Sequence, residues 1–174
     1  MYKPYRTKHR SASAFTLVEL LCSVVVIGVL TGIALPNYIG ASNKAKQACV
    51  INNMHQVQTA VEAWAVANGG IYPPMIDTEL QSYFPGGGGD GITPAPGGPT
   101  NPFSSIKEWP VLGSVADVGL ERLKAPTDII AAGCSEYSPI ANVYGSIDTY
   151  AVRGGGYGGQ VIASPHGTLV LSNQ

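Results

Sequence analysis

The chain has 174 residues, enough for one folded domain, and 45% of them are hydrophobic while only 12% are charged. Its formal net charge of −1 hides an asymmetry, because four of the ten basic residues lie within residues 1–14 and all eleven acidic residues follow them. Residues 15–174 therefore carry a net charge of −5. This excludes nucleic acid as a general partner, since binding it requires a basic surface.

The first predicted element is an apolar run over residues 15–35 that contains a single charge, Glu19. As a helix it would reach about 32 Å, enough to cross the hydrocarbon core of a bilayer. The basic residues of 1–14 predict that the N-terminus stays on the cytoplasmic side. We therefore expect residues 15–36 to form a transmembrane helix with the rest of the chain outside the cytoplasm.

Three interpretations of this run compete. A secretory signal would have a shorter apolar core followed by small residues, whereas here the small residues 11–14 come before it. A plain membrane anchor leaves Glu19 unexplained, because a carboxylate inside a membrane segment is costly and is by default functional. A peptidase cut between Ala14 and Phe15, with Glu19 retained for a partner charge, accounts for both observations.

Residues 14–19, Ala-Phe-Thr-Leu-Val-Glu, resemble the N-terminus of type IV pilins and of type II secretion pseudopilins. That family has a basic leader, a small residue, an N-terminal Phe, Glu four residues later, and an apolar run that ends in Pro, here Pro36. The resemblance is strong over residues 11–73 and weak beyond. One departure is Ala14, since the family nearly always has Gly before the cut.

The resemblance implies a processing pathway and a fold. Residues 1–14 would be a leader that a prepilin peptidase removes after Ala14, and Phe15 would then be N-methylated. The implied fold is α+β: a long N-terminal helix whose second half packs against a small antiparallel sheet of three to four strands. Glu19 and Pro36 would be assembly residues, Glu19 as a charge partner and Pro36 as a bend or melted turn.

The resemblance also implies a structural protein, not an enzyme. Subunits would wait in the lipid of the inner membrane and then polymerise with copies of themselves, and with minor pilins, at an inner-membrane assembly platform. The major secretion subunit usually has a calcium loop and an Asp-Pro-Trp-like segment, whereas this chain has Asn-Pro-Phe at 101–103 and no acidic cluster. This favours a type IV pilus subunit; a type II secretion pseudopilin that drives protein export is the alternative.

Residues 37–70 read as the amphipathic second half of the long helix, which we expect to run from Phe15 to about Asn68. One apolar face recurs at spacings of four, three, four and three residues, at Val50, Met54, Val57, Val61 and Trp64. Gly69 and Gly70 predict a left-handed cap at its end. The second half should therefore carry a domain on one side.

Residues 71–174 read as a loop-rich head with Phe103 in its core and a short helix near residues 120–124. Alternation and turn residues predict a C-terminal antiparallel meander with strands at 146–152, 160–163 and 168–171. One face of this sheet should cover the apolar face of the long helix.

The sequence predicts no metal site, no cofactor and no catalytic residue. Its histidines, His9, His55 and His166, are scattered and show no metal-ligand spacing. Cys22 reads as a small buried hydrophobe. Cys49 and Cys134 lie outside the cytoplasm on this topology, where disulfides persist, so a Cys49–Cys134 bond and two separate thiols are both open interpretations.

Overall fold

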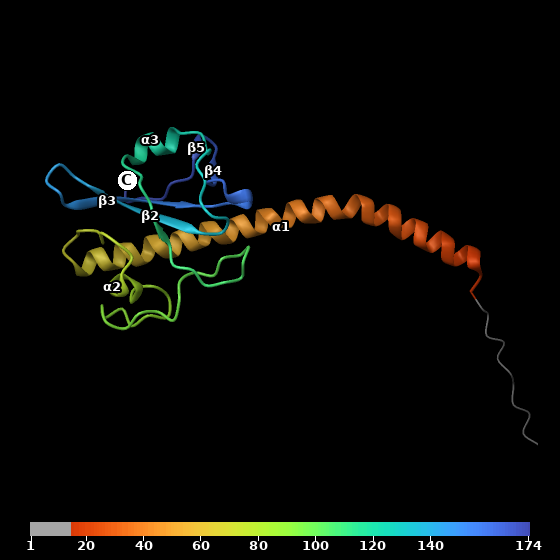
Figure 1. The fold of residues 1–174 in the computed structure, drawn as a ribbon, viewed down its shortest axis with the longest axis horizontal. Coiled ribbons are helices and arrows are strands. Elements are labelled where there is room, and N and C mark those ends of the chain that lie inside the picture. Colours follow the sequence, from red (N-terminus) through yellow and green to blue (C-terminus); the bar gives the residue numbers. More distant parts are fainter. Residues whose placement is uncertain (1–14) are drawn as a thin grey trace, which may run out of the picture. The chain divides into compact units, whose positions relative to one another are not determined.

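The computed structural model describes residues 15–174. Its main element is α1, Leu17–Ala67, a single helix of 51 residues that is continuous through Pro36. This confirms the predicted long helix to within two residues at each end. The elements that follow, shown in Figure 1, are α2 (Thr78–Gln81), β1 (Val111–Leu112), α3 (Val118–Leu123), β2 (Ser135–Ala141), β3 (Ile147–Gly154), the 3-10 turn η1 (Tyr157–Gly159), β4 (Ala163–Ser164) and β5 (Gly167–Thr168).

The chain divides into two compact parts, one ending at Ala41 and one spanning Ser42–Gln174. In the first part every residue from Phe15 to Ala41 is exposed. Its most apolar 18-residue window has a mean hydropathy of 2.4, and α1 is the only helix among residues 15–174 long and apolar enough to cross a membrane. The part that carries the head begins at Ser42 rather than at residue 37, because residues 37–41 are as exposed as those before them.

The core of the second part forms on one face of α1. Val50, Met54, Val57 and Val61 are fully buried, as the spacing predicts, and Trp64 packs against them while remaining partly exposed. Figure 1 shows the sheet lying along this half of α1. The buried residues that meet the helix face from the head are Leu80, Phe84, Ala95, Tyr137, Tyr150, Val152 and Ile162.

The sheet of the head has the order β1-β2-β3, and β4 and β5 form a separate antiparallel pair. β2 and β3 are an antiparallel hairpin with Tyr137 opposite Val152, while β1 runs parallel to β2. The α+β fold class is therefore confirmed. The sheet is mixed rather than wholly antiparallel.

The predicted C-terminal meander is confirmed in part. Its first strand, 146–152, corresponds to β3, but the hairpin partner of β3 is β2, a segment in which the sequence shows no alternation. The other two predicted strands pair with each other where they face, as β4 and β5, with Ala163 opposite Thr168. Each reaches the β3 region through a single bridge, Gly155 with Val161 and Val152 with Leu171. β2 escapes prediction because its buried stretch, Ser135–Ser138, is mostly polar.

Three smaller predictions are confirmed. α1 ends in a left-handed cap: Gly69 has φ 70°, and the Gly70 amide donates to the Ala65 carbonyl at 2.8 Å. The short helix expected near residues 120–124 is α3, whose first turn is capped by the Asp117 side chain. Phe103 is partly buried and packs against the core.

Candidate functional site

The predicted assembly site lies in the first turn of α1, where Thr16 and Glu19 bind each other reciprocally. The Thr16 amide and hydroxyl donate to Glu19 Oε2 at 3.0 and 2.9 Å, and the Glu19 amide donates to Thr16 Oγ1 at 3.2 Å. This is a capping box, which satisfies backbone N–H groups that a helix start leaves without partners. The Thr-x-x-Glu spacing at 16–19 is a local signal for it that the sequence reasoning missed.

The capping box uses only one oxygen of the Glu19 carboxylate. All the hydrogen bonds that it accepts within residues 15–174 go to Oε2. Phe15 is 81% exposed beside it. Glu19 therefore has a local role in starting the helix, and its Oε1 accepts no hydrogen bond within residues 15–174.

The other residues of the predicted cleavage and bending sites are placed as follows. Ala14 lies outside the described residues, so only Phe15 represents the predicted junction. Pro36 sits inside α1, and the Asn37 side-chain amide donates to the Ile33 carbonyl at 3.4 Å one turn earlier. The predicted break at Pro36 concerns subunits packed together, so it stays a prediction.

The cysteines are free thiols in the structure. Cys22 is exposed rather than buried, because no other segment within residues 15–174 packs on the helix around it. Cys49 is exposed, while Cys134 is half-buried and donates to Glu108 Oε2 at 3.0 Å. Burial, and then the Glu108 carboxylate, raise the pKa of the Cys134 thiol to about 11. At neutral pH this thiol is protonated, which slows disulfide exchange, and the Cys49–Cys134 bond stays a prediction.

Asn101 is a buried hub that the sequence reasoning missed. Its side-chain amide donates to Glu108 Oε2 at 3.0 Å and to the Ala132 carbonyl at 2.9 Å. Its oxygen accepts from the Phe103 amide at 2.8 Å. The hydrogen bonds from Asn101, and next from Cys134, lower the pKa of the Glu108 carboxyl. The hub holds the turn that carries Phe103 against the start of β2.

Arg153 on β3 is a second buried polar centre that was missed. Its guanidinium donates to Glu136 Oε1 on β2 at 2.6 Å, to Asp128 Oδ2 at 2.8 Å, and to Glu121 on α3. The Arg153 side chain is only 7% exposed. A side-chain cation thus neutralises a converging set of carboxylates, and the cluster ties α3 to the hairpin.

Metal-ligand chemistry finds no support in the described part of the chain. Residues 15–174 contain no group of three or more His, Cys, Asp or Glu side chains placed to hold a metal. Asp90 lies among the glycines of residues 86–91 and accepts from the Ile92 amide at 2.9 Å and the Thr93 amide at 2.7 Å, so its carboxylate closes its own turn. These hydrogen bonds, that of Thr93 first, lower the pKa of the Asp90 carboxyl.

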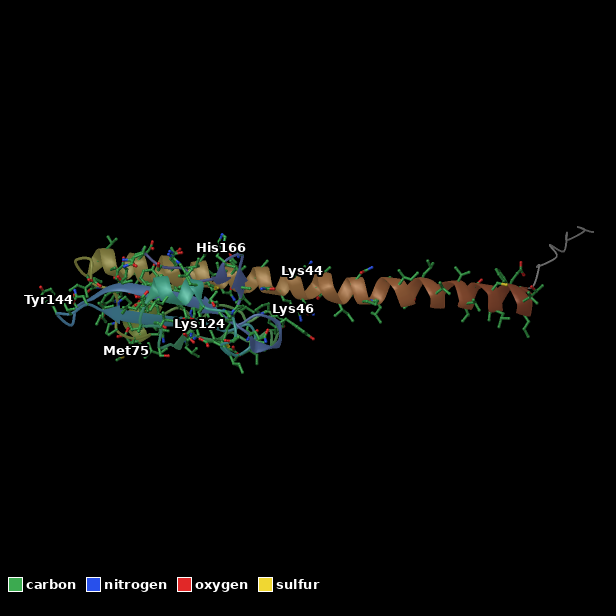
Figure 2. The ribbon with its side chains drawn as sticks, turned by 90° about the horizontal axis from the view of Figure 1, so that it is seen from above. Lys44, Lys46, Met75, Lys124, Tyr144 and His166 are labelled. Carbon is green, nitrogen blue, oxygen red and sulfur yellow. The ribbon has the colours of Figure 1, made fainter. Side chains whose placement is uncertain are left out.

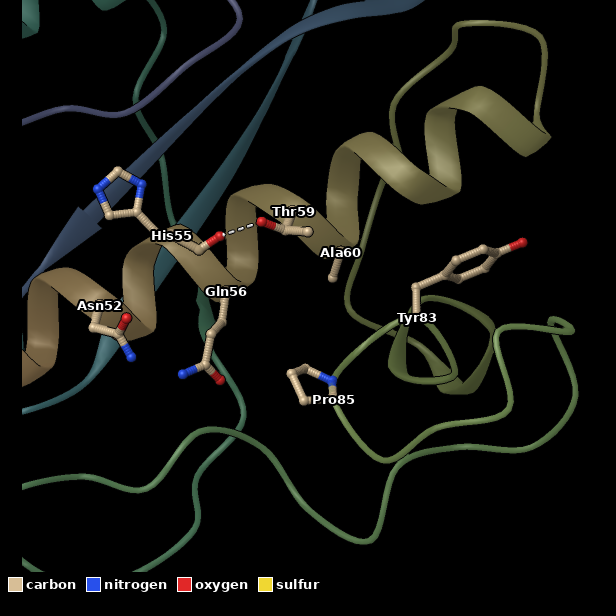
Figure 3. Close-up of a pocket in the computed structure, with 7 residues that line it drawn as sticks. All are labelled: Asn52, His55, Gln56, Thr59, Ala60, Tyr83 and Pro85. Carbon is tan, nitrogen blue, oxygen red and sulfur yellow. Dashed lines mark hydrogen bonds between the residues drawn. The ribbon is translucent and has the colours of Figure 1, made fainter.

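A cavity of about 330 Å³ lies between α1 and the loop after α2. It is shown in Figure 3 and is lined by Asn52, His55, Gln56, Thr59, Ala60, Tyr83 and Pro85. The Thr59 hydroxyl donates to the His55 carbonyl at 2.9 Å and so closes its own turn of α1. The cavity brings together no nucleophile with a base and no pair of carboxylates, so it offers no constellation for catalysis.

Comparison with known proteins adds two findings. Residues 9–35 match the prokaryotic N-terminal methylation motif. Relatives include the type II secretion system core protein G of Vibrio cholerae, 30% identical over 66 residues that cover 38% of this chain and 44% of the relative. The fimbrial protein EcpB of Eikenella corrodens is 41% identical over 63 residues, covering 36% and 38%. The type IV major pilin protein PilA of Myxococcus xanthus is 38% identical over 50 residues, covering 29% and 23%.

These matches cover about half or less of the three relatives' own lengths. No solved structure matches the chain significantly. The methylation motif and the exposed apolar α1 with a small α+β head define a pilin-like protein. With the names of its relatives, they support a likeness to type IV pilins and type II secretion pseudopilins. The apolar helix fits membrane anchoring and a place in a filament.

Proposed function

We propose that this chain is a structural subunit of a type IV pilus. It is made as a prepilin, cleaved after Ala14, N-methylated on Phe15 and polymerised through α1. The observation that carries the proposal is that residues 15–41 are apolar and exposed all around the helix. A surface of this kind needs lipid or other apolar helices around it. In a filament core made of such helices, the neighbouring subunits supply them.

Glu19 sets the register of assembly in this proposal. Cleavage exposes an α-amine on Phe15, which is cationic at neutral pH. A buried amine or carboxylate alone costs several kcal/mol, whereas a pair neutralises both charges. Apolar faces alone can slide along one another, but a buried charge pair cannot slide without exposing both charges. The Glu19 oxygen that the capping box leaves over is the acceptor for the amine of a neighbouring subunit.

Pro36 provides the bend in the same scheme. It lacks a backbone N–H, and its ring crowds the preceding turn, at a cost of about 3 kcal/mol within a helix. Gly32 lies one turn earlier and weakens the helix there as well. We expect the helix to bend or melt at Pro36 when subunits pack. A filament map with a straight, unbroken helix there would contradict this.

The partners follow from this cycle. The subunit waits in the inner membrane as a single-pass protein with its head outside the cytoplasm, in contact with lipid. A prepilin peptidase processes it, and an inner-membrane platform assembles it with copies of itself and with minor pilins.

The alternative is a pseudopilin of a type II secretion system, and it has specific support. The relatives include the type II secretion system core protein G of Vibrio cholerae, Aeromonas hydrophila and Klebsiella michiganensis. The pilus is favoured because the Asp90 carboxylate is engaged within its own turn and because Asn101 begins an Asn-Pro-Phe segment.

Electron microscopy of cells with and without the gene tests the proposal. We expect deletion to remove surface filaments and the cloned gene to restore them. Mass spectrometry of purified filaments should find a chain that begins with N-methylated Phe15. Normal filaments after deletion, together with loss of exported proteins, would support the pseudopilin instead. An intact leader in assembled filaments would contradict the processing scheme.

A further inference from the structure

One end of the part Ser42–Gln174 brings together segments that are far apart in the sequence. Lys46 Nζ lies 5.2 Å from the centroid of the Phe103 ring, and the Phe103 and Tyr157 ring centroids are 6.4 Å apart. Ile129 forms a bridge with Gln160, directly after the turn that carries Tyr157. We call these four residues, Lys46, Phe103, Ile129 and Tyr157, the proximal face, because Lys46 lies near the start of this part of the chain.

The proximal face exposes apolar surface that the head does not use for its own core. Ile129 is 84% exposed and Tyr157 is 65% exposed. The tip of the β2–β3 hairpin offers a matched pair, Val143 and Tyr144, at 92% and 91% exposure. Figure 2 shows Tyr144 at the other end of this part from Lys46.

Lys46 is the one charged side chain among the four residues of the proximal face. Within the described chain, Lys46 lies over an aromatic ring and joins no ion pair. Of the carboxylates next to the face in the sequence, Asp128 is paired with cations, whereas Glu108 is hydrogen-bonded by neutral groups and keeps its negative charge. Glu108 accepts from Asn101 and Cys134, and Asp128 accepts from Lys124 and Arg153.

Lysine beside exposed aromatic and aliphatic side chains is the combination found where proteins meet the bilayer surface. Lys46 follows Ile39, the last large aliphatic residue of the apolar segment, by seven residues of the same helix, or roughly 10 Å of rise. A headgroup layer is about 5 to 8 Å thick, and the lysine side chain spans the remaining distance. Lys46, and with it the proximal face, therefore follows the apolar segment at the distance expected for the headgroup layer of a bilayer that this segment spans.

We propose that the proximal face docks on anionic phospholipid headgroups while the subunit is anchored in the membrane. The ammonium of Lys46 binds phosphate, and the Ile129 and Tyr157 side chains enter the interface. The inference rests on the membrane-anchored stage of the proposed function. It adds a second contact with lipid, made by the head rather than by the apolar helix.

The test uses the full chain, isotope-labelled, in nanodiscs of phosphatidylethanolamine and phosphatidylglycerol that contain a little gadolinium-chelating lipid. We expect paramagnetic broadening of the Phe103 and Tyr157 amides and sharp signals at Tyr144. Replacing Lys46 by Gln should lower the ratio of docked to free heads by about fivefold, the effect of one lysine at an anionic surface. Nanodiscs of phosphatidylethanolamine alone, which lack the anionic lipid, should likewise lower the ratio of docked to free heads.

Two double variants test whether docking depends on the proximal face or on any exposed apolar side chains of the head. Ile129→Ser with Tyr157→Ser should abolish the broadening at the Phe103 amide, and Val143→Ser with Tyr144→Ser should leave it unchanged. Both pairs are exposed, so both variants should fold; unaltered amide spectra of the core in nanodiscs without gadolinium lipid check this.

Each remaining outcome overturns the proposal in a distinguishable way. Broadening at residues 37–41 without broadening of the face would leave anchoring intact and refute docking. No broadening at residues 37–41 would refute the anchored stage and docking together. A face variant that broadens normally but fails to form filaments would assign the face to a second copy of the chain.

Discussion

The two halves of α1 contain the same apolar residue types, but these are exposed in the first half and buried in the second. Val24 and Val25, in the first half, are 59% and 57% exposed, whereas Val50, Val57 and Val61, in the second half, are fully buried. The helix geometry is the same in both halves, so the difference comes from what packs against them. The second half obtains its partners from the head of its own chain. The first half must obtain them from lipid or other subunits, so its side chains should matter for assembly and not for the stability of the head.

The largest expected effect lies in the first half, at Glu19. Glu19→Gln keeps an oxygen that can cap the helix but removes the charge, so we expect processed, membrane-inserted protein and no filaments. Thr16→Ala removes the cap and keeps the charge, and should still assemble. Filament counts by electron microscopy, with membrane fractionation of the subunit, distinguish the two. Normal filaments from Glu19→Gln would assign Glu19 to capping alone.

The next largest effect should come from Arg153 in the head. Arg153→Met leaves the surrounding carboxylates without their buried cation, which should lower the free energy of unfolding by about 3 to 5 kcal/mol. Lys124→Met removes an exposed cation near the same acids and should cost far less, because solvent screens an exposed ion pair. Urea unfolding of the full chain in detergent, followed by tryptophan fluorescence, measures both. Equal effects would mean that burial of Arg153 is not what matters.

The two halves of α1 can be compared directly with one pair of truncations. Met54→Ala opens a cavity in the core and should lower the free energy of unfolding of the head by about 2 to 5 kcal/mol. Leu21 is 59% exposed, so Leu21→Ala should leave that free energy unchanged. The same urea experiment applies. A loss of head stability in Leu21→Ala would show that the first half has partners within its own chain.

The smallest expected effect is on how the stability of the head falls at acidic pH. Lys124, and next Arg153, lower the pKa of the Asp128 carboxyl in the folded head, and Asn101 lowers that of Glu108. Their contribution is present above the unfolded pKa values of about 3.9 and 4.3, and it is lost as pH falls through the lower folded values. Asp128→Asn should therefore flatten the loss of stability below about pH 4, by under 1 kcal/mol because Asp128 is partly exposed. An unchanged slope would contradict the role of Asp128.

Local patterns were enough to predict α1, its apolar face and its glycine cap. The spacing from Val50 to Val61 and the position of Gly69 are read within one or two helical turns, and no distant residue is needed to interpret them. The same holds for residues 14–19, which carry the family resemblance. The capping box of Thr16 and Glu19 is local too, and it was within reach of the same reasoning.

Only the tertiary structure decided how the head is built. Glu136 makes its strand look polar, and it is buried there because Arg153, on the neighbouring strand, neutralises it. Asn101 donates to Glu108 and to the Ala132 carbonyl, which sequence spacing does not bring together. The proximal face likewise exists only where Lys46, Phe103 and Tyr157 meet. Burial of a polar side chain depends on which distant partner satisfies it, and the pattern around one residue does not contain that partner.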